Sequence, residues 1–331
     1  MGLLHAGIFN QLESSTIIAA AERDRLTSNL FKTYVPLISI YNDYNEMFKQ
    51  EDLDVVAIAT PVFLHKPIIE SALEHDCHIF VEKPLALNGE ECQSVIHKRS
   101  DRKTLVGYNR RFLETFKLAK RIIDGSLLGM IKMLQSQMFV TQVLRREQGW
   151  RYDPAQSGGG AIIDLGTHVI DMLHYLIGPI SRIHGVAQSM FSDKVDDYAA
   201  ANLQFERGLA GSLEVSWSMR NYRLPEMKVA MQFDNGALTV TEKYIEIYSD
   251  IDNDFLNRGW NTFYLQDLTQ GVPIDLGGPE YTEQDLHLLE CIRNDEETLC
   301  NFREAAKTNF VVDAMYDSIK TGEMHKAHYK V

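Results

Sequence analysis

The stretch DVVAIATPVFLHKPIIESALEHDCHIFVEKP, residues 54–84, contains one complete strand–helix–strand unit. Residues 54–60 and 77–82 are short runs of apolar and β-branched residues, which are typical of parallel strands covered on both faces. Between them, residues 65–75 show the spacing of an amphipathic helix. A helix between two such strands predicts a right-handed crossover and therefore a parallel sheet.

The same alternation extends in both directions from this unit. Strands that alternate with helices predict a doubly wound parallel sheet, here over residues 1–112. Strands are expected at 16–22, 54–60, 77–82 and 104–108, and helices at 24–34, 45–50, 65–75 and 88–100.

The first segment of the chain is unusual for such a domain. Its apolar residues have helical spacing, and no strand stands before it; they are Leu3, Leu4, Ile8, Phe9 and Leu12. In the dinucleotide-binding strand order, the first strand lies in the middle of the sheet, so a gap there would leave both neighbours without a backbone partner. We interpret Met1 as an internal methionine or the chain as truncated. The alternative is a genuine start with a different sheet order.

The pattern changes after Phe112. Long alternating runs joined by the turn signals ERG (206–208) and DNG (234–236) predict an antiparallel sheet, and with its helices a second, α+β domain over 113–331. Thr282 and Asp285 resemble a capping box at the start of a helix. The expected strands are 131–141, 182–191, 197–205, 209–219, 228–233 and 237–249, and the helices are 112–129, 159–178, 282–295 and 303–322.

Composition narrows the possible functions. The 331 residues include 33 Lys and Arg against 46 Asp and Glu, a net charge of −13, which argues against binding to nucleic-acid phosphates or to an anionic membrane surface. No apolar run is long enough to span a bilayer, and no secretory signal is visible. The four cysteines are scattered without a C-x-x-C pair, which argues against a disulfide framework or a zinc ribbon. We therefore expect a cytoplasmic protein.

Two chemistry-bearing segments follow predicted strands. Thr60 and Pro61 end one strand, with His65 at the start of the next helix, and Glu82-Lys83-Pro84 ends the other. The carboxyl ends of strands in an open α/β sheet line the ligand crevice. A Lys that is partly desolvated there can exchange a proton, although a surface Lys beside a turn is the simpler interpretation.

A third segment is a helix that begins with three glycines at 158–160. Asp164, His168 and Asp171 lie at i, i+4 and i+7 on one face of it, and His174 falls near the same side. Three interpretations stay open: Asp164 and His168 hydrogen-bond each other, the face binds a divalent ion, or Asp164 orients His168 as a general base.

Together these segments resemble the glucose-fructose oxidoreductase / inositol dehydrogenase / MocA (Gfo/Idh/MocA) family. The motifs are ATP-x3-H at 59–65, EKP at 82–84, GYNRRF at 107–112, GGG-x3-D-x-G-x-H-x2-D at 158–171 and FERG at 205–208. The resemblance implies a two-domain NAD(P)-dependent dehydrogenase that acts on CH–OH groups. It implies a Rossmann-type first domain, here without its first strand, and a second domain with an open-faced, mostly antiparallel sheet that often forms the oligomer contact.

The resemblance also implies roles for individual residues. Lys83, Asp164 and His168 take the catalytic positions, and the Lys83–Pro84 bond is expected to be cis. His168 would accept the hydroxyl proton, Asp164 would stabilise the resulting imidazolium, and Lys83 would hydrogen-bond the reacting oxygen. This role needs no metal.

The expected substrate is a sugar, a polyol or a sugar derivative. Arginines near the motifs would suit a carboxylate or a phosphate, so an acidic sugar or a nucleotide sugar is included. The residues that could line the pocket with the catalytic three are Arg110, Arg111, Trp150, Arg151 and Tyr152; the alternative for each is a surface Arg or a core aromatic residue.

For the cofactor, Gly2 matches the third glycine of G-x-G-x-x-G, and Glu22 stands 20 residues later, where a carboxylate grips the ribose 2′-hydroxyl. This favours NAD over NADP, although Arg23 could pair with a phosphate. The other residues expected to contact the cofactor are Thr60, Pro61, His65, Glu82 and Lys83.

The first strand and the first two glycines are absent. Two rival functions therefore stay open: a non-catalytic dinucleotide- or sugar-binding sensor, and a metal-dependent hydrolase or lyase built on Asp164 and His168. A homo-oligomer, dimer or tetramer, is expected through the C-terminal sheet.

Overall fold

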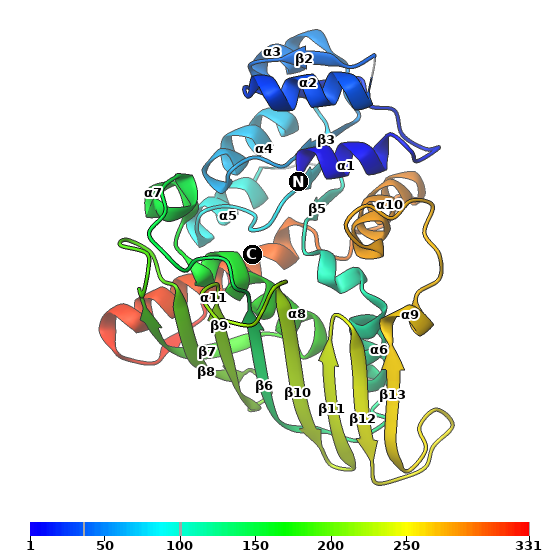
Figure 1. Ribbon diagram of the computed structural model, residues 1–331, viewed down its shortest axis with the longest axis vertical. Helices are drawn as coiled ribbons and strands as arrows, with labels where there is room; N and C mark the ends of the chain where they lie inside the picture. Colours follow the sequence, from blue (N-terminus) through cyan, green and yellow to red (C-terminus); the bar gives the residue numbers. More distant parts are fainter. Residues whose placement is uncertain (36, 99–100, 331) are drawn as a thin grey trace. The chain divides into compact units, whose positions relative to one another are not determined.

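The computed structural model describes residues 1–35, 37–98 and 101–330 (Figure 1). The chain forms two compact units, and the polypeptide passes between them more than once. The first unit comprises 1–86, 90–109 and 271–305, and the second comprises 87–89, 110–270 and 306–331. The predicted boundary at residue 112 stays a prediction. Residues 99 and 100, at the end of the helix expected over 88–100, and Val331 lie outside the described residues.

The first unit contains two separate parallel sheets. One pairs β1 with β2, and the other has the order β3-β4-β5. Among the described residues, β1 and β3 each pair with one strand only, as expected for a Rossmann-type sheet without its first strand. The strands are β1 (Ala19–Ala21), β2 (Ser39–Tyr41), β3 (Val55–Ile58), β4 (His78–Val81) and β5 (Thr104–Val106).

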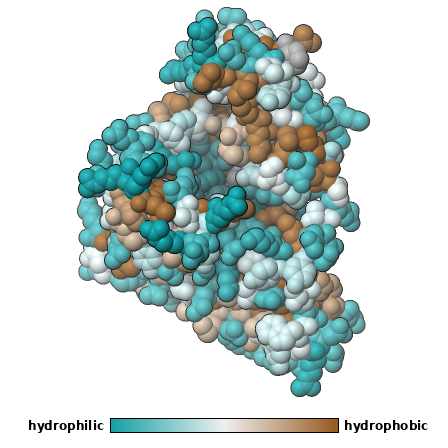
Figure 2. Space-filling view, viewed as in Figure 1, coloured by the Kyte–Doolittle hydropathy of each residue, from teal (hydrophilic) through white to brown (hydrophobic). Residues whose placement is uncertain are grey.

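Helices alternate with these strands, which confirms the α/β class of this unit. They are α1 (Gly2–Phe9), α2 (Arg25–Tyr34), α3 (Tyr44–Gln50), α4 (His65–Glu74), α5 (Gly89–Ile96) and α10 (Pro279–Asn294). Figure 2 shows apolar surface over the part of this unit that α1 and α2 occupy in Figure 1. On α2, Leu26, Leu30 and Tyr34 are exposed, whereas Phe31 is buried. Only one side of α2 therefore contributes to the core.

The second unit is built on a nine-stranded sheet in the order β13-β12-β11-β10-β6-β9-β8-β7-β14. All neighbours are antiparallel except β6 and β9, so the expected mostly antiparallel sheet is confirmed. The strands are β6 (Ile131–Phe139), β7 (Ile180–Gln188), β8 (Tyr198–Phe205), β9 (Ala210–Ser216), β10 (Glu226–Phe233), β11 (Gly236–Thr241), β12 (Tyr244–Ser249), β13 (Gly259–Tyr264) and β14 (His325–Lys326).

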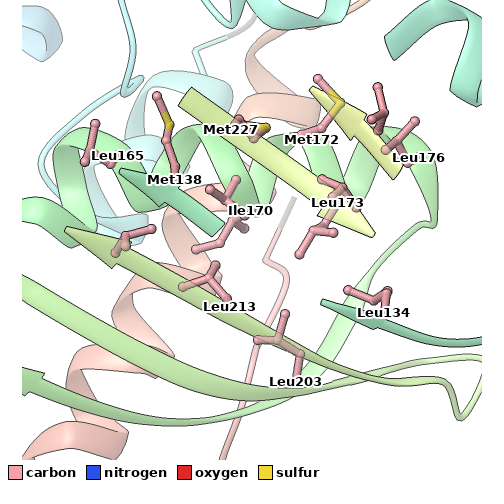
Figure 3. Packing of buried hydrophobic residues seen from close by; sticks show 14 of the residues in the cluster. Leu134, Met138, Leu165, Ile170, Met172, Leu173, Leu176, Leu203, Leu213 and Met227 are labelled. Carbon is pink, nitrogen blue, oxygen red and sulfur yellow. The ribbon is translucent and has the colours of Figure 1, made fainter. Parts of the chain in front are cut away.

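Helices pack against one face of this sheet. Figure 3 shows α8 residues Ile170, Met172 and Leu173 directed toward apolar side chains of the strands, among them Leu213 and Met227. Apart from α10, the α-helices that follow β5, of which the short α7 lies away from the strands (Figure 1), are α6 (Glu114–Asp124), α7 (Pro154–Ser157), α8 (Thr167–Leu176), α9 (Leu265–Leu268) and α11 (Phe302–Thr321). This core fixes α8, which carries His168, against the sheet. Among the described helices, none is long and apolar enough to cross a membrane.

Two predictions about elements were wrong. The run 237–249 is not one strand, because the chain turns back at residues 242–243, where Thr241 Oγ1 accepts hydrogen bonds from the Lys243 and Tyr244 amides at 3.1 and 3.2 Å. The capping box was also wrong. Helix α10 begins three residues earlier than expected, after Gly278, and the Thr282 hydroxyl donates to the Ile274 carbonyl at 2.6 Å.

Candidate active site

In the first unit, His65 joins the two loops that follow β3 and β4. Its Nδ1 lies 2.9 Å from the Pro84 carbonyl and its Nε2 lies 3.0 Å from the Thr60 carbonyl. Burial lowers the pKa of His65, and a neutral ring can donate to only one of these oxygens. His65 is therefore a buried link between the Thr60 loop and the Lys83–Pro84 turn.

The residues at the carboxyl ends of β1 and β3 are consistent with a bound dinucleotide. The Thr60 hydroxyl is buried and has no hydrogen-bond partner among the described residues, so a polar ligand group there would remove a desolvation cost. Glu22 follows β1 and is half-buried, with Oε1 accepting from the Asp24 amide at 2.7 Å. Arg23 is exposed, and its Nε donates to the Asn42 carbonyl at 3.4 Å.

At the end of β4, the Lys83–Pro84 peptide bond is cis, as expected. Lys83 is half-buried, and its amide donates to Glu82 Oε2 at 3.2 Å. Glu82 Oε1 lies 3.1 Å from His5 Nε2, and His5 Nδ1 lies 2.9 Å from Asp285 Oδ2. The sequence did not predict the contact with Asp285, because Asp285 lies 280 residues from His5 and was interpreted as part of a capping box.

The charges of Glu82 and Asp285 determine the protonation state of His5. Burial lowers the pKa of His5, but the two carboxylates more than offset that effect and raise the pKa to about 9. Burial, the largest single effect, raises the pKa of Glu82, but the hydrogen bond and charge of His5 together with the charge and amide of Lys83 outweigh it, so the net shift is downward. His5 is therefore cationic at neutral pH.

In the second unit, Asp164 lies in a π-helical turn, Ile162–Gly166, that leads into α8. The helix predicted over 159–178 is present over 162–176, and its first turn is π-helical. Asp164 is half-buried and His168 is buried. Single π-helical turns inside helices are frequent at functional sites.

Two of the three glycines before this turn leave no room for a side chain. A Cβ on Gly159 would lie 1.9 Å from the Tyr316 hydroxyl, and one on Gly160 would lie 2.0 Å from the Asp196 carbonyl. The Asp196 carboxylate accepts from the Gly160 and Ile162 amides at 3.0 and 2.8 Å and from the Tyr316 hydroxyl at 2.7 Å. Asp196 therefore fixes the entry to the turn that carries Asp164.

Asp171 and His174 have structural partners. Arg111 binds both oxygens of Asp171, at 2.7 and 2.9 Å, and both side chains are buried. His174 Nε2 lies 3.2 Å from the Tyr329 hydroxyl, and burial lowers the pKa of His174 to about 3. Within the described ranges, no group of three His, Cys, Asp or Glu residues could hold a metal ion.

The residues predicted to contact substrate have different surroundings. Arg110 Nε donates to Glu242 Oε1 at 2.9 Å. Arg151 is exposed, with its guanidinium 5.3 Å from the centre of the Trp150 ring. The Tyr152 hydroxyl donates to Glu147 at 3.3 Å. Arg110 is thus already ion-paired within its own unit, whereas Arg151 projects into solvent.

The parallel sheets and the antiparallel unit define an α/β protein of the dinucleotide-binding class. Residues 1–109 match the model described as an oxidoreductase family with an NAD-binding Rossmann fold, and residues 116–240 match the GFO/IDH/MocA C-terminal domain. The two matches together cover most of the chain. The chain belongs to the Gfo/Idh/MocA oxidoreductase family, so the predicted family membership is confirmed.

Known relatives agree with this assignment. The chain is 32% identical over 185 residues to scyllo-inositol 2-dehydrogenase (NAD(+)) of Bacillus subtilis, which is 53% of this chain and 52% of the relative. It is 29% identical over 203 residues to levoglucosan dehydrogenase of Pseudarthrobacter phenanthrenivorans, 53% and 52% of the two chains. The chain spans about half the length of these curated relatives.

A solved structure shares the fold along nearly the whole chain. Levoglucosan dehydrogenase in complex with NADH and levoglucosan superimposes with a TM-score of 0.87 at 22% identity, covering 98% of this chain and 95% of that one. At this identity the likeness concerns the fold alone.

Proposed function

We propose that the protein is an NAD(P)-dependent dehydrogenase that acts on a secondary hydroxyl of a sugar, a polyol or a sugar derivative, including acidic and nucleotide sugars. One observation carries the proposal: His65 links the two loops at the carboxyl edge of the first unit. Its ring nitrogens lie 3.0 Å from the Thr60 carbonyl and 2.9 Å from the Pro84 carbonyl. Relatives named as dehydrogenases of levoglucosan and scyllo-inositol support the substrate class.

The residues divide the chemistry among them. The nicotinamide, when bound, supplies the hydride chemistry. His168 accepts the proton of the substrate hydroxyl, and Asp164 stabilises the imidazolium that forms. The Lys83 ammonium donates a hydrogen bond to the reacting oxygen and offsets its developing negative charge. For the cofactor, Thr60 offers its buried hydroxyl and Glu22 its carboxylate.

The test is a panel of polyols, aldoses and nucleotide sugars followed through cofactor absorbance. With the best substrate, Lys83→Ala and His168→Ala are expected to lower kcat/KM by about 10²- to 10⁴-fold, the contribution of a positioned proton-transfer group. Lys49→Ala, which removes an exposed ammonium from α3, is the matched control and should behave as wild type. Wild-type turnover by both variants would refute these roles.

Measurements of cofactor binding test two further points: whether the protein is a non-catalytic sensor, and whether it prefers NAD over NADP. Saturable quenching of protein fluorescence by NADH, without turnover of any substrate, would support the sensor. For an enzyme, Glu22→Ser should reduce the preference for NADH over NADPH, because a carboxylate repels a 2′-phosphate. An unchanged preference would show that Glu22 does not read the ribose.

The open face of the large sheet supports a homo-oligomer. The cytoplasm is proposed as its compartment because the four scattered cysteines form no C-x-x-C pair. Trp260 and Tyr264 on β13 and Tyr248 on β12 are exposed, and Trp260 packs edge-on against Tyr248 with ring centres 5.4 Å apart. Exposed aromatic patches mark interaction surfaces. Trp260→Asp should lower the mass seen in analytical ultracentrifugation, and an unchanged mass would place the contact elsewhere.

A further inference from the structure

A buried cluster of three charged side chains lies behind the Lys83 turn, entirely within the first unit. His5 from α1 contacts Asp285 from α10 through Nδ1 at 2.9 and 3.0 Å, and Glu82 after β4 through Nε2 at 3.1 Å. Ionised carboxylates only accept hydrogen bonds, so a ring that faces one on each side needs a proton on both nitrogens. The geometry alone therefore favours the imidazolium.

This cluster is costly to build. His5 is 1% exposed, the Asp285 side chain 0% and the Glu82 side chain 14%. The Phe80 ring lies 4.5 Å and the Tyr281 ring 6.2 Å from the His5 ring, so the surroundings are apolar and aromatic. Well-packed apolar side chains often stabilise a core as well as a buried ion pair does. Stability is therefore a weak reason for charges at this place.

The cluster contacts the segment that carries Lys83. Glu82 presents one oxygen to His5 and the other to the Lys83 amide at 3.2 Å. A Cβ on Gly107 would lie 3.1 Å from Glu82 Oε2 and 3.3 Å from Glu82 Cα, so the residue just after β5 packs closely against Glu82. The Glu82 side chain has little freedom while His5 is present.

We propose that His5 is a positioning residue, which ties Glu82 to Asp285 and thereby fixes the backbone and the orientation of Lys83. Its effect on turnover rests on the proposed function, because only there does Lys83 contact the substrate. Its effect on Lys83 itself does not depend on that function. His5 also lies on α1, so the same contact connects the first helix of the dinucleotide-binding unit with the Lys83 turn.

The experiment measures the reactivity of Lys83 directly. Each folded protein is treated with a small amount of an amine-acylating reagent at pH 8, and the modification of each lysine is quantified by peptide mass spectrometry. In His5→Gln, Lys83 should react at least five-fold faster than in wild type, because it loses its fixed orientation. In Glu82→Gln the same increase is expected, because the carboxylate that accepts from the Lys83 amide is also removed. Lys49 on α3 serves as the internal standard.

A matched variant separates positioning from stability. Thr282→Val removes a buried hydrogen bond from the same helix as Asp285 without touching His5, so Lys83 should react as in wild type. If an active substrate is found, kcat of His5→Gln should fall about 10- to 100-fold with KM for NADH unchanged, the scale of a small misplacement of a catalytic group.

Two results would overturn the proposal: Lys83 reactivity within two-fold of wild type in the folded Gln variants, or an equal increase in Thr282→Val. If His5→Gln does not fold, Glu82→Gln decides, because its amide keeps the shape of the side chain. A protein that turns over no substrate, yet shows the labelling change, would refute the proposed function and leave the positioning role standing.

Discussion

Among single-residue substitutions, those in the buried pair of Arg111 and Asp171 should lower the free energy of unfolding most. Both side chains are almost completely buried and meet through two hydrogen bonds. Removing one partner of a buried pair leaves an uncompensated charge, at a cost of about 3–5 kcal/mol. Asp171→Asn should lower the free energy of unfolding by that order, measured by urea denaturation.

The exposed pair of Asp76 and Arg102 provides the comparison for this prediction. The side chain of Asp76 is 70% exposed, so Asp76→Asn should change the free energy of unfolding by less than about 1 kcal/mol. Equal losses in the two variants would show that the second-unit core does not depend on the Arg111–Asp171 contact.

At the scale of elements, the π-helical turn depends on the glycines before it. In Gly160→Ala, the new Cβ would lie 2.0 Å from the Asp196 carbonyl, so the turn or the start of β8 has to shift. We expect a loss of several degrees in the unfolding midpoint, followed by circular dichroism.

Gly166 supplies a control from the same turn. Its Cβ would meet Ile162 at 3.6 Å, an ordinary contact, and Ala is a better helix former than Gly. Gly166→Ala should therefore keep or raise the midpoint. If Gly160→Ala unfolds at the same temperature as Gly166→Ala, the close approach to Asp196 does not limit the stability of this turn.

Elements were predictable where periodicity or a motif was strong. The strands around 54–60 and 77–82 and the helix between them form as expected, because their runs of apolar and β-branched residues favour strands. Cover on both faces was wrong for β3, where Ala57 is exposed. The three-residue strand β2 was missed, since so short a segment has no measurable period. The turn at residues 242–243 was missed because neither Glu242 nor Lys243 is a turn-forming residue.

The candidate site was predictable only in part, for a physical reason. Motifs marked Lys83, Asp164 and His168, and their catalytic roles stay predictions. The partners that hold such residues come from distant segments: Asp285 for His5, and Tyr316 for Asp196 beside the glycines. Tertiary packing determines those contacts, and local spacing carries no signal for them.

For the whole molecule, the His5 cluster predicts how stability depends on pH. The pKa of His5 is about 9 in the folded protein and near 6.5 when unfolded, so its stabilisation is complete below pH 6.5 and is lost as pH rises through 9. The groups that face it are Asp285, whose pKa burial raises, and Glu82, whose pKa its contact with His5 lowers.

The shift corresponds to about 3 kcal/mol of unfolding free energy between pH 6.5 and 10. Urea denaturation of wild type should show this decline, and the decline should be smaller by about that amount in His5→Gln. Parallel pH profiles for the two proteins would mean that His5 is neutral in the folded state.

The division of the first unit into segments that reach from residue 1 to residue 305 also bears on its synthesis. A ribosome delivers the chain in order, and domains made of continuous sequence can fold as they emerge. Here α1, which carries His5, is synthesised early. Its partner Asp285 is synthesised only with α10, after most of the second unit has been made. The nascent first unit must therefore wait, incompletely assembled, for most of translation, and a chaperone that shields exposed apolar surface has its longest opportunity to bind there.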